Sequence, residues 1–298
     1  MTCRMKSADI HIYYDHEKSD TDTLESYIKT AIHDVVVVSP QCTVGTEPAK
    51  SRNMYRFQHI LSNFFIGRKI QKYLTSSFYN DKNQLRPFYR LFSSRFKTLE
   101  KVMLPDNTKM IEKFQTIDEI KLWCWINPKN SVSIEELALL AHEKVFGLKI
   151  HMFWHKLKID DLRNLMSQHL IKLNKPIYLI LDWMDSQELE AFLNEYSMYT
   201  WILGYGGFPM TKTGIEMTSK LDNVYIDISS FHLSIRWLKT IRAEVDSHKI
   251  LYSTDFPYNF NPVGEKFSYK LFEERLVKSD LEIDAIRLNS YRMVNGVN

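Results

Sequence analysis

Three side chains that could take part in catalysis follow one another near the amino terminus. Asp9, His11 and Tyr13 alternate with apolar residues in the segment Ala8–Tyr13, which is predicted to be a buried β-strand. Side chains two positions apart in a strand point to the same side, so we expect a carboxylate, an imidazole and a phenol together. Such a set could bind a metal ion, move a proton or stabilise an oxyanion.

More side chains of this kind stand at the carboxyl ends of other predicted strands. They are His151 with His155 four positions later, Asp182, Tyr205 before a Gly-Gly pair, and Asp255 in a Ser-Thr-Asp-Phe-Pro turn. The carboxyl ends of parallel strands meet at one edge of a sheet, and in a barrel this edge forms the active site. We therefore expect these side chains to lie near His11. Lys149, inside one of the strands, is expected to be structural.

Eight short apolar segments alternate with longer amphipathic ones along the chain. The predicted strands are Ala8–Tyr13, Asp34–Ser39, Ile120–Ile126, Gly147–Met152, Pro176–Asp182, Thr200–Tyr205, Asn223–Ile228 and Lys249–Thr254. Several of them are continuously apolar, as strands covered on both faces must be. This alternation predicts an α/β protein, a (β/α)8 TIM barrel formed by a single domain over residues 1–298.

The segment 50–113, between the second and third predicted strands, is too long for one crossover and is strongly basic. It contains 14 Lys or Arg and four Asp or Glu, which gives it a charge of +10 and leaves −7 on the rest of the chain. We expect a helical insertion of two or three helices beside the active site. Arg86 and Arg90 are four positions apart and would share a helix face, where they could bind a carboxylate or phosphate.

The basic insertion is compatible with several partners. An anionic small-molecule substrate and an acidic carrier protein both fit, and so does a surface that pairs two copies into a homodimer. The net charge of only +3 and the lack of a known nucleic-acid-binding motif argue against nucleic acid. A charged segment can also be no more than a solvated helix face.

The overall composition is that of a folded, reduced protein. Hydrophobic residues make up 44% of the 298 residues, and the three cysteines are too few and too scattered for a disulfide framework. There is no apolar run of about 18 residues that could span a membrane and no apolar stretch of a signal peptide in 1–9. We expect a cytoplasmic protein.

Several short motifs, taken in order, resemble the amidohydrolase-related family. They are Asp9-x-His11, Asn127-Pro128, Gly147–His151, Gly206-Gly207, Asn223–Ser229, the Ser-x-Asp-x-Pro turn at Ser253–Pro257, and Asn289-Ser290-x-Arg292. The chain is similar over nearly its whole length to this branch of the amidohydrolase superfamily, which includes aminocarboxymuconate semialdehyde decarboxylase and pyrone dicarboxylate lactonase. The resemblance implies a distorted (β/α)8 barrel and, because oligomers are common in the family, a homodimer.

The resemblance also implies a metal site that has changed. The family holds its metal with His-x-His on strand 1, a His after strand 5 and an Asp after strand 8, and carries a catalytic His on strand 6. His11 and Asp255 match this pattern, whereas Tyr13, Asp182 and Tyr205 (or Gly204 beside it) stand at the other three places.

Two catalytic schemes remain open from the sequence. In the first, His11, Asp182 and Asp255 bind a divalent ion such as Zn²⁺ or Mn²⁺, with His151 or His155 as a further ligand. In the second there is no metal, and Asp255, with its pKa raised in the barrel mouth, acts as a general base.

We expect a hydrolase that cleaves an ester, lactone or amide bond of an anionic small molecule. Asp255, His11 and Tyr13 would carry the catalysis. His151, His155 and Tyr205, together with Arg86 and Arg90, would bind the substrate. A metal-dependent nonoxidative decarboxylase and a catalytically inactive binding or scaffold protein are the alternatives.

Overall fold

The computed structural model describes residues 5–14, 21–31, 33–40, 43–45, 84–85, 100–102, 104–169, 174–229, 233–257 and 269–296. Eight parallel strands form one sheet in the order β1-β2-β6-β7-β8-β9-β10-β11. They are β1 (Ala8–Tyr14), β2 (Val35–Pro40), β6 (Ile120–Ile126), β7 (Val145–His151), β8 (Ile177–Ile180), β9 (Trp201–Leu203), β10 (Val224–Asp227) and β11 (Ile250–Leu251). Each of the eight predicted strands is confirmed, and so is the (β/α)8 barrel.

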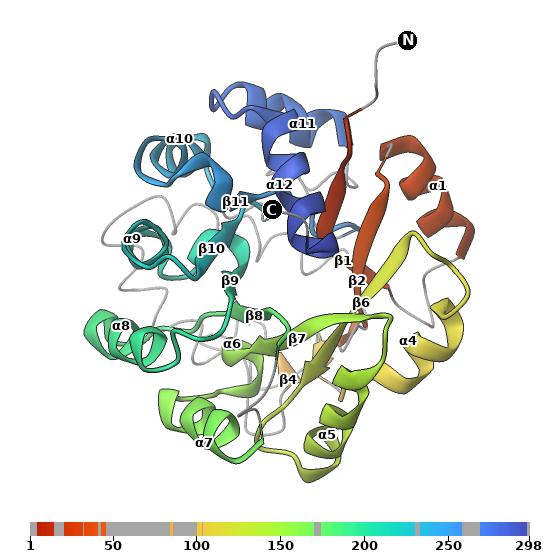
Figure 1. Cartoon of the computed structure of the whole chain (residues 1–298), viewed down its shortest axis with the longest axis vertical. Coiled ribbons are helices and arrows are strands. Elements are labelled where there is room, and N and C mark those ends of the chain that lie inside the picture. The colour runs from red at the N-terminus through yellow and green to blue at the C-terminus, as the bar shows by residue number, and fades with distance from the viewer. Residues whose placement is uncertain are drawn as a thin grey trace, which may run out of the picture.

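Helices surround this sheet, as Figure 1 shows in a view along the barrel. They are α1 (Thr21–Ala31), α4 (Asn107–Phe114), α5 (Ser131–Glu135), α6 (Met152–His155), α7 (Ile159–His169), α8 (Ser186–Glu195), α9 (Thr211–Lys220), α10 (Ile235–Glu244), α11 (Tyr269–Val277) and α12 (Ile283–Asn295). Helix α12 packs against both β1 and β11 and so covers the junction of the first and last strands. No helix in the described ranges is long and apolar enough to cross a membrane.

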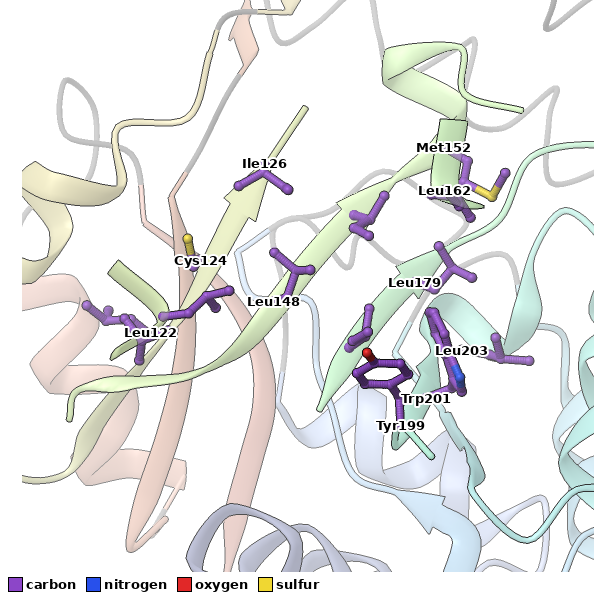
Figure 2. Close-up of a cluster of buried hydrophobic side chains, with 14 of the residues drawn as sticks. Leu122, Cys124, Ile126, Leu148, Met152, Leu162, Leu179, Tyr199, Trp201 and Leu203 are labelled. Atoms are coloured by element: carbon purple, nitrogen blue, oxygen red, sulfur yellow. The ribbon is translucent and has the colours of Figure 1, made fainter. Parts of the chain in front are cut away.

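Alternation along the strands separates an outer core from an inner one. Leu122, Cys124 and Ile126 of β6 belong to the outer core between the sheet and its helices, which continues to Leu148 of β7 and Leu179 of β8 (Figure 2). The inner core fills the barrel with Ile10, Val37, Trp123, Tyr178, Ile180, Ile202 and Leu251. The barrel is therefore solid, and only polar inward side chains above this layer are available for chemistry.

Gly147 allows β7 to approach its neighbours closely. A Cβ at this position would lie 2.3 Å from the carbonyl oxygen of Pro176 and 2.6 Å from Trp123 Cζ3. We expect Gly147→Ala to lower the free energy of unfolding by about 1–3 kcal/mol, because backbone must move to make room. Thermal denaturation of the two proteins would measure this. A loss clearly below about 1 kcal/mol in Gly147→Ala would contradict the prediction.

Backbone hydrogen bonds close the barrel between β1 and the segment that follows β11. Ile10 N donates to Tyr252 O (3.2 Å), Asp255 N to His11 O (3.0 Å) and Tyr13 N to Phe256 O (2.8 Å). Asp255 is thus held beside His11 by main-chain contacts and not only by its side chain.

A β-bulge in β1 changes which side chains share a face. Asp9 pairs with Val36 and Ile12 with Val38, so two residues of β1 stand opposite one of β2. His11 keeps its side chain inside the barrel, but Asp9 accepts a hydrogen bond from Tyr27 of the outer helix α1 (2.6 Å). The prediction that Asp9 shares a face with His11 and Tyr13 is therefore wrong, because strict alternation does not hold across a bulge.

The described parts of the basic insertion contribute two strands of a small antiparallel sheet, whose third strand (Thr43–Gly45) precedes residue 50, and one helix. Strands β3 (Thr43–Gly45), β5 (Glu100–Val102) and β4 (Gln84–Leu85) pair antiparallel in that order, and α4 follows them. The pattern of this segment predicted helices only, so the sheet is new. The remainder of the insertion, with Arg86 and Arg90, lies outside the described residues, and the expected helices there remain a prediction.

Candidate active site

Five side chains form a closed circuit of polar contacts at the carboxyl ends of the strands. Lys149 of β7 contacts Tyr13 (2.9 Å) and His11 (2.8 Å), both of β1. The Tyr13 hydroxyl contacts that of Tyr205 after β9 (2.8 Å), which donates to Oδ1 of Asp255 (3.1 Å). His11 Nδ1 closes the circuit 3.6 Å from the same Oδ1. We call these five residues the polar ring.

Lys149 is the fully buried cation of the polar ring. Its Nζ donates to His11 Nε2, to Tyr13 Oη and to Ser39 Oγ at the end of β2 (3.0 Å). Its ammonium also lies 4.0 Å from the ring centroids of Tyr13 and Trp125. A buried ammonium requires such a set of hydrogen-bond acceptors and aromatic faces.

Asp255 is the carboxylate of the polar ring and is held in an unusual backbone conformation. Its φ of 58° lies in the left-handed region, which costs a residue with a side chain about 1 kcal/mol or more. Burial raises the pKa of its carboxyl well above the usual value, and the charge of Lys149 and the Tyr205 hydrogen bond oppose this rise only in part. A carboxylate with a raised pKa is a stronger base than an exposed one.

His11 is neutral in this environment. Its pKa lies well below the usual value, first because the ring is buried and second because the Lys149 charge is close. The imidazole stacks on Tyr178 at a centroid distance of 4.6 Å. His11 Nδ1 is buried and has no hydrogen-bond partner in the described part of the chain, so it is available to a water or substrate beside Asp255.

Asp227, at the end of β10, positions Tyr205 through a hydrogen bond to its backbone. Its Oδ1 accepts from Tyr205 N (2.8 Å) and from Ser229 N (3.1 Å), and its Oδ2 accepts from the Tyr178 hydroxyl. Tyr205 has a φ of 57°, a second left-handed conformation within the polar ring. The Asp227 carboxylate stabilises this turn and orients the Tyr178 ring on which His11 stacks.

A group of aromatic rings lies beside Lys149. His151 stacks on Trp154 with centroids 4.3 Å apart, and Trp125 contacts both this pair and His155. Burial, followed by the charge of Lys149, lowers the pKa of His155 to about 4. Burial, followed by the charge of Lys149, also lowers the pKa of His151 well below the usual value. Both imidazoles are therefore neutral and lie near Lys149, and their role in substrate binding remains a prediction.

Unsatisfied polar atoms gather on this side of the barrel. Eight buried side-chain nitrogen or oxygen atoms have no hydrogen-bond partner within the described residues. Five of them are here: His11 Nδ1, the indole nitrogens of Trp125 and Trp183, and both ring nitrogens of His155. Most buried polar atoms in proteins are hydrogen-bonded, so such a group indicates where water or a ligand supplies the missing partners.

The structure does not bring Asp182 into the polar ring. Asp182 follows β8 and accepts a hydrogen bond from Trp183 N (2.7 Å) in the loop before α8. In the part of the chain that the structure describes, no group of three or more His, Cys, Asp or Glu side chains could hold a metal ion. His11 Nε2, which would be a ligand atom, is already bonded to the Lys149 ammonium.

The donor set therefore does not fit the metal site expected from His11, Asp182 and Asp255. The physical reason is the position of Lys149, whose positive charge stands next to His11 where a divalent ion would have to bind. Binding of Zn²⁺ or Mn²⁺ by this chain remains a prediction for metal analysis.

Sequence reasoning found four members of the polar ring but did not place the fifth among them. His11, Tyr13, Tyr205 and Asp255 come together as predicted, but Lys149 was expected to be structural. Its signal was present in the sequence, because Lys149 stands between Leu148 and Ile150 in a buried strand. A charged residue at such a place must have several partners.

Comparisons with known proteins establish the fold. No model of a protein family and no curated protein sequence matches the chain. A solved structure of a probable 2-pyrone-4,6-dicarboxylic acid hydrolase from Acinetobacter baumannii, with citric acid bound, is 12% identical, with a TM-score of 0.57 over 98% of this chain and 100% of that one. An uncharacterized TIM-barrel protein from Bordetella bronchiseptica is 10% identical, with a TM-score of 0.56 over 98% of this chain and 99% of that one.

A third solved structure extends this structural similarity. It is amidohydrolase 2 from Bifidobacterium longum subsp. infantis, 13% identical, with a TM-score of 0.50 over 98% of this chain and 99% of that one. All three similarities extend over nearly the whole of both chains. The chain therefore shares the (β/α)8 barrel fold of these three proteins.

Proposed function

We propose that the chain is a hydrolase of the amidohydrolase-related family that cleaves an ester, lactone or amide bond in an anionic small molecule. The observation that supports this most directly is the convergence of two polar groups, Tyr205 Oη and His11 Nδ1, on Oδ1 of Asp255. Asp255 is the general base, and no metal takes part in the steps that follow.

In this proposal Asp255 takes a proton from a water molecule that lies beside His11 Nδ1. The hydroxide oxygen attacks the carbonyl carbon of the substrate, and the carbonyl oxygen becomes an oxyanion. Tyr205 is protonated, because burial and the neighbouring Asp255 raise the pKa of its phenol well above the usual value. Its hydroxyl can therefore turn from Asp255 to the oxyanion as a neutral donor. Asp255 then returns its proton to the leaving oxygen or nitrogen as the bond breaks.

Substrate binding would use the unsatisfied polar atoms on the same side. The indole N–H groups of Trp125 and Trp183 are donors only, and His155 offers one donor and one acceptor in its neutral form. Donors beside the Lys149 cation favour carbonyl and carboxylate oxygens. The structural similarity to a probable 2-pyrone-4,6-dicarboxylic acid hydrolase with citric acid bound supports an anionic substrate of this kind.

The basic insertion would add to the attraction of an anion through its net charge of +10. Arg86 and Arg90 remain the proposed contacts to a substrate carboxylate. An acidic carrier protein that presents the substrate, and a homodimer, remain further proposals for this surface.

The proposed function is tested by turnover of a panel of lactones, esters and amides that carry carboxylates, with and without a chelator and over a range of pH. We expect activity that survives chelation and that rises with pH along a single acidic limb. The limb reports ionisation of Asp255 together with that of Asp227, which holds Tyr205. Burial raises the pKa of both carboxyls, so the limb should lie above the pH at which an exposed aspartate titrates. His11 adds no limb near neutral pH, because its pKa is lowered. Circular dichroism over the same pH range would show that the protein stays folded.

Three other outcomes would contradict this proposal. Stoichiometric bound metal together with loss of activity on chelation would indicate a metal-dependent hydrolase. Release of CO₂ from the carboxylates of the panel would indicate a decarboxylase. Binding of the panel without any turnover would leave a binding or scaffold protein.

A further inference from the structure

We propose that Lys149 is a positioning residue that fixes the direction of every hydrogen bond in the polar ring. Tyr205 then donates to Asp255, and His11 presents an N–H to the space beside the Asp255 carboxylate. In part this inference rests on the proposed function, since it explains how Asp255 would be held as the base. Its structural content, a single tautomer of His11 and a single donor order, does not depend on any substrate.

The first step concerns the ammonium itself. An ammonium group has three N–H donors and no acceptor. The Lys149 ammonium contacts three acceptor atoms, namely His11 Nε2, Tyr13 Oη and Ser39 Oγ, at 2.8, 2.9 and 3.0 Å. Each contact can exist in one direction only, from Lys149 outward.

The second step concerns the chain of hydrogen bonds that runs from Lys149 through the two tyrosines to Asp255. Tyr13 Oη accepts from Lys149, so its own proton is available to the Tyr205 hydroxyl 2.8 Å away. Tyr205 in turn donates to Asp255 Oδ1 at 3.1 Å. Without the ammonium the two hydroxyls could exchange roles, because either can be the donor. With it, the order Lys149 to Tyr13 to Tyr205 to Asp255 is the one that uses every proton.

The third step concerns the contacts that run from Lys149 through the His11 imidazole towards Asp255. His11 Nε2 lies 2.8 Å from the Lys149 ammonium, which can only donate, so Nε2 has no proton and the imidazole is neutral with one ring proton. Because Nε2 accepts from Lys149, the proton must sit on Nδ1, which lies 3.6 Å from Asp255 Oδ1. The imidazole thus presents an N–H to the space beside the carboxylate, where a water oxygen or a substrate oxygen would accept it.

The fourth step is that Lys149 has little freedom to do anything else. It is fully buried, and its ammonium is 4.0 Å from the centroids of both the Tyr13 and the Trp125 ring. Its partners come from β1 and β2, whereas Lys149 stands on β7, so it joins separate parts of the barrel. A cation fixed in this way supplies positive charge to the site permanently.

The inference is tested by nitrogen NMR of protein labelled with ¹⁵N-histidine, in which the His11 signals are assigned by their loss in His11→Gln. In the native protein we expect His11 to be neutral and protonated at Nδ1. In Lys149→Met, which keeps the length of the side chain but has no donor, we expect the proton to move to Nε2 or to divide between the two nitrogens. Lys144→Met is the matched control, since Lys144 is also buried but its Nζ donates to Ile117 O outside the polar ring.

Activity gives a second readout if the panel yields a substrate. Lys149→Met should lower kcat by about 10- to 100-fold with little change in KM, which is the usual effect of removing a group that orients the reacting ones. Its acidic limb should also move to higher pH, because the Lys149 charge lowers the pKa of Asp255. Lys144→Met should leave both quantities as in the native protein.

The outcomes separate this inference from the proposed function. An Nε2-protonated His11 in the native protein would overturn the inference, even if Lys149→Met did not fold, and so would an unchanged tautomer in a folded Lys149→Met. A tautomer that shifts as expected in a protein without turnover would support the inference and count against the hydrolase proposal.

Discussion

Asp255→Asn is expected to lower turnover by about 10²–10⁴-fold while leaving the protein folded, because an amide cannot accept the proton of the attacking water. Asparagine has nearly the same shape, tolerates the left-handed conformation that Asp255 adopts (φ 58°) and still offers an oxygen to the Tyr205 hydroxyl. It also removes a buried carboxylate whose ionisation burial disfavours. The midpoint of thermal unfolding should therefore be unchanged or higher, as is common when an active-site charge is removed.

The matched control is Asp182→Asn, which makes the same chemical change at the same end of the barrel. Asp182 lies outside the polar ring and accepts from Trp183 N in a loop, so turnover should stay close to the native value. Steady-state kinetics and thermal scans of the three proteins would measure both effects. Equal activity of native protein and Asp255→Asn would show that Asp255 is not the base. Loss of activity in Asp182→Asn would instead favour a metal site that includes this residue.

Asp9→Leu is expected to lower the free energy of unfolding by about 3–5 kcal/mol, the usual effect of removing one partner from a buried polar network. Asp9 accepts four hydrogen bonds, from His11 N (3.1 Å), Tyr27 Oη (2.6 Å), Thr254 N (3.2 Å) and Thr254 Oγ1 (2.6 Å). Leucine fills a similar volume but removes the acceptor shared by these four donors, at the point where β1 meets the segment after β11. Urea denaturation would measure the loss.

Asp9→Asn is the control for this effect. The amide oxygen can still accept from the two backbone N–H groups, and the hydroxyls of Tyr27 and Thr254 can reverse to accept from the amide nitrogen. We therefore expect a much smaller loss than in Asp9→Leu. Equal losses in the two variants would mean that the volume or charge of Asp9, and not its acceptor atoms, stabilises the closure.

The pH dependence of stability in the native protein and in Asp9→Asn provides a further test. Burial raises the pKa of Asp9 from 3.8 to about 6, with its hydrogen bonds opposing the rise. The folded state therefore binds a proton more tightly than the unfolded state, so the contribution of Asp9 to stability is fully present below the unfolded pKa and is lost as pH rises through about 6. Asp9→Asn lacks this dependence, so its stability relative to the native protein should improve between pH 4 and 7.

Much of the barrel could be predicted from the sequence because its strands are covered on both faces. Segments such as Val35–Val38 and Ile177–Leu181 are apolar without interruption, which a strand in a parallel sheet must be and a solvated loop cannot be. The end of such an apolar segment also shows where the strand ends. For this reason His11, Tyr205 and Asp255 could be assigned to one site.

Other features depend on contacts that no local pattern contains. The bulge in β1 arises from its pairing with β2 and turns Asp9 away from His11, although the sequence alternates regularly there. The role of Lys149 depends on acceptors that come from β1 and β2, more than a hundred positions away in the chain. The position of Asp182 outside the polar ring has the same origin, because the direction of a side chain just after a strand is set by the loop that follows.

The closure of the barrel between Asp9 and Thr254 has a consequence for synthesis on the ribosome. These two residues are separated by 245 positions, and a ribosome that adds about 5–20 residues per second needs about 12–50 s to cover that distance. During this time one edge of β1 has no partner strand, and its N–H and C=O groups can pair with other extended chains. A chaperone that binds the nascent first strand would therefore be expected to raise the yield of folded protein more than one that binds later segments.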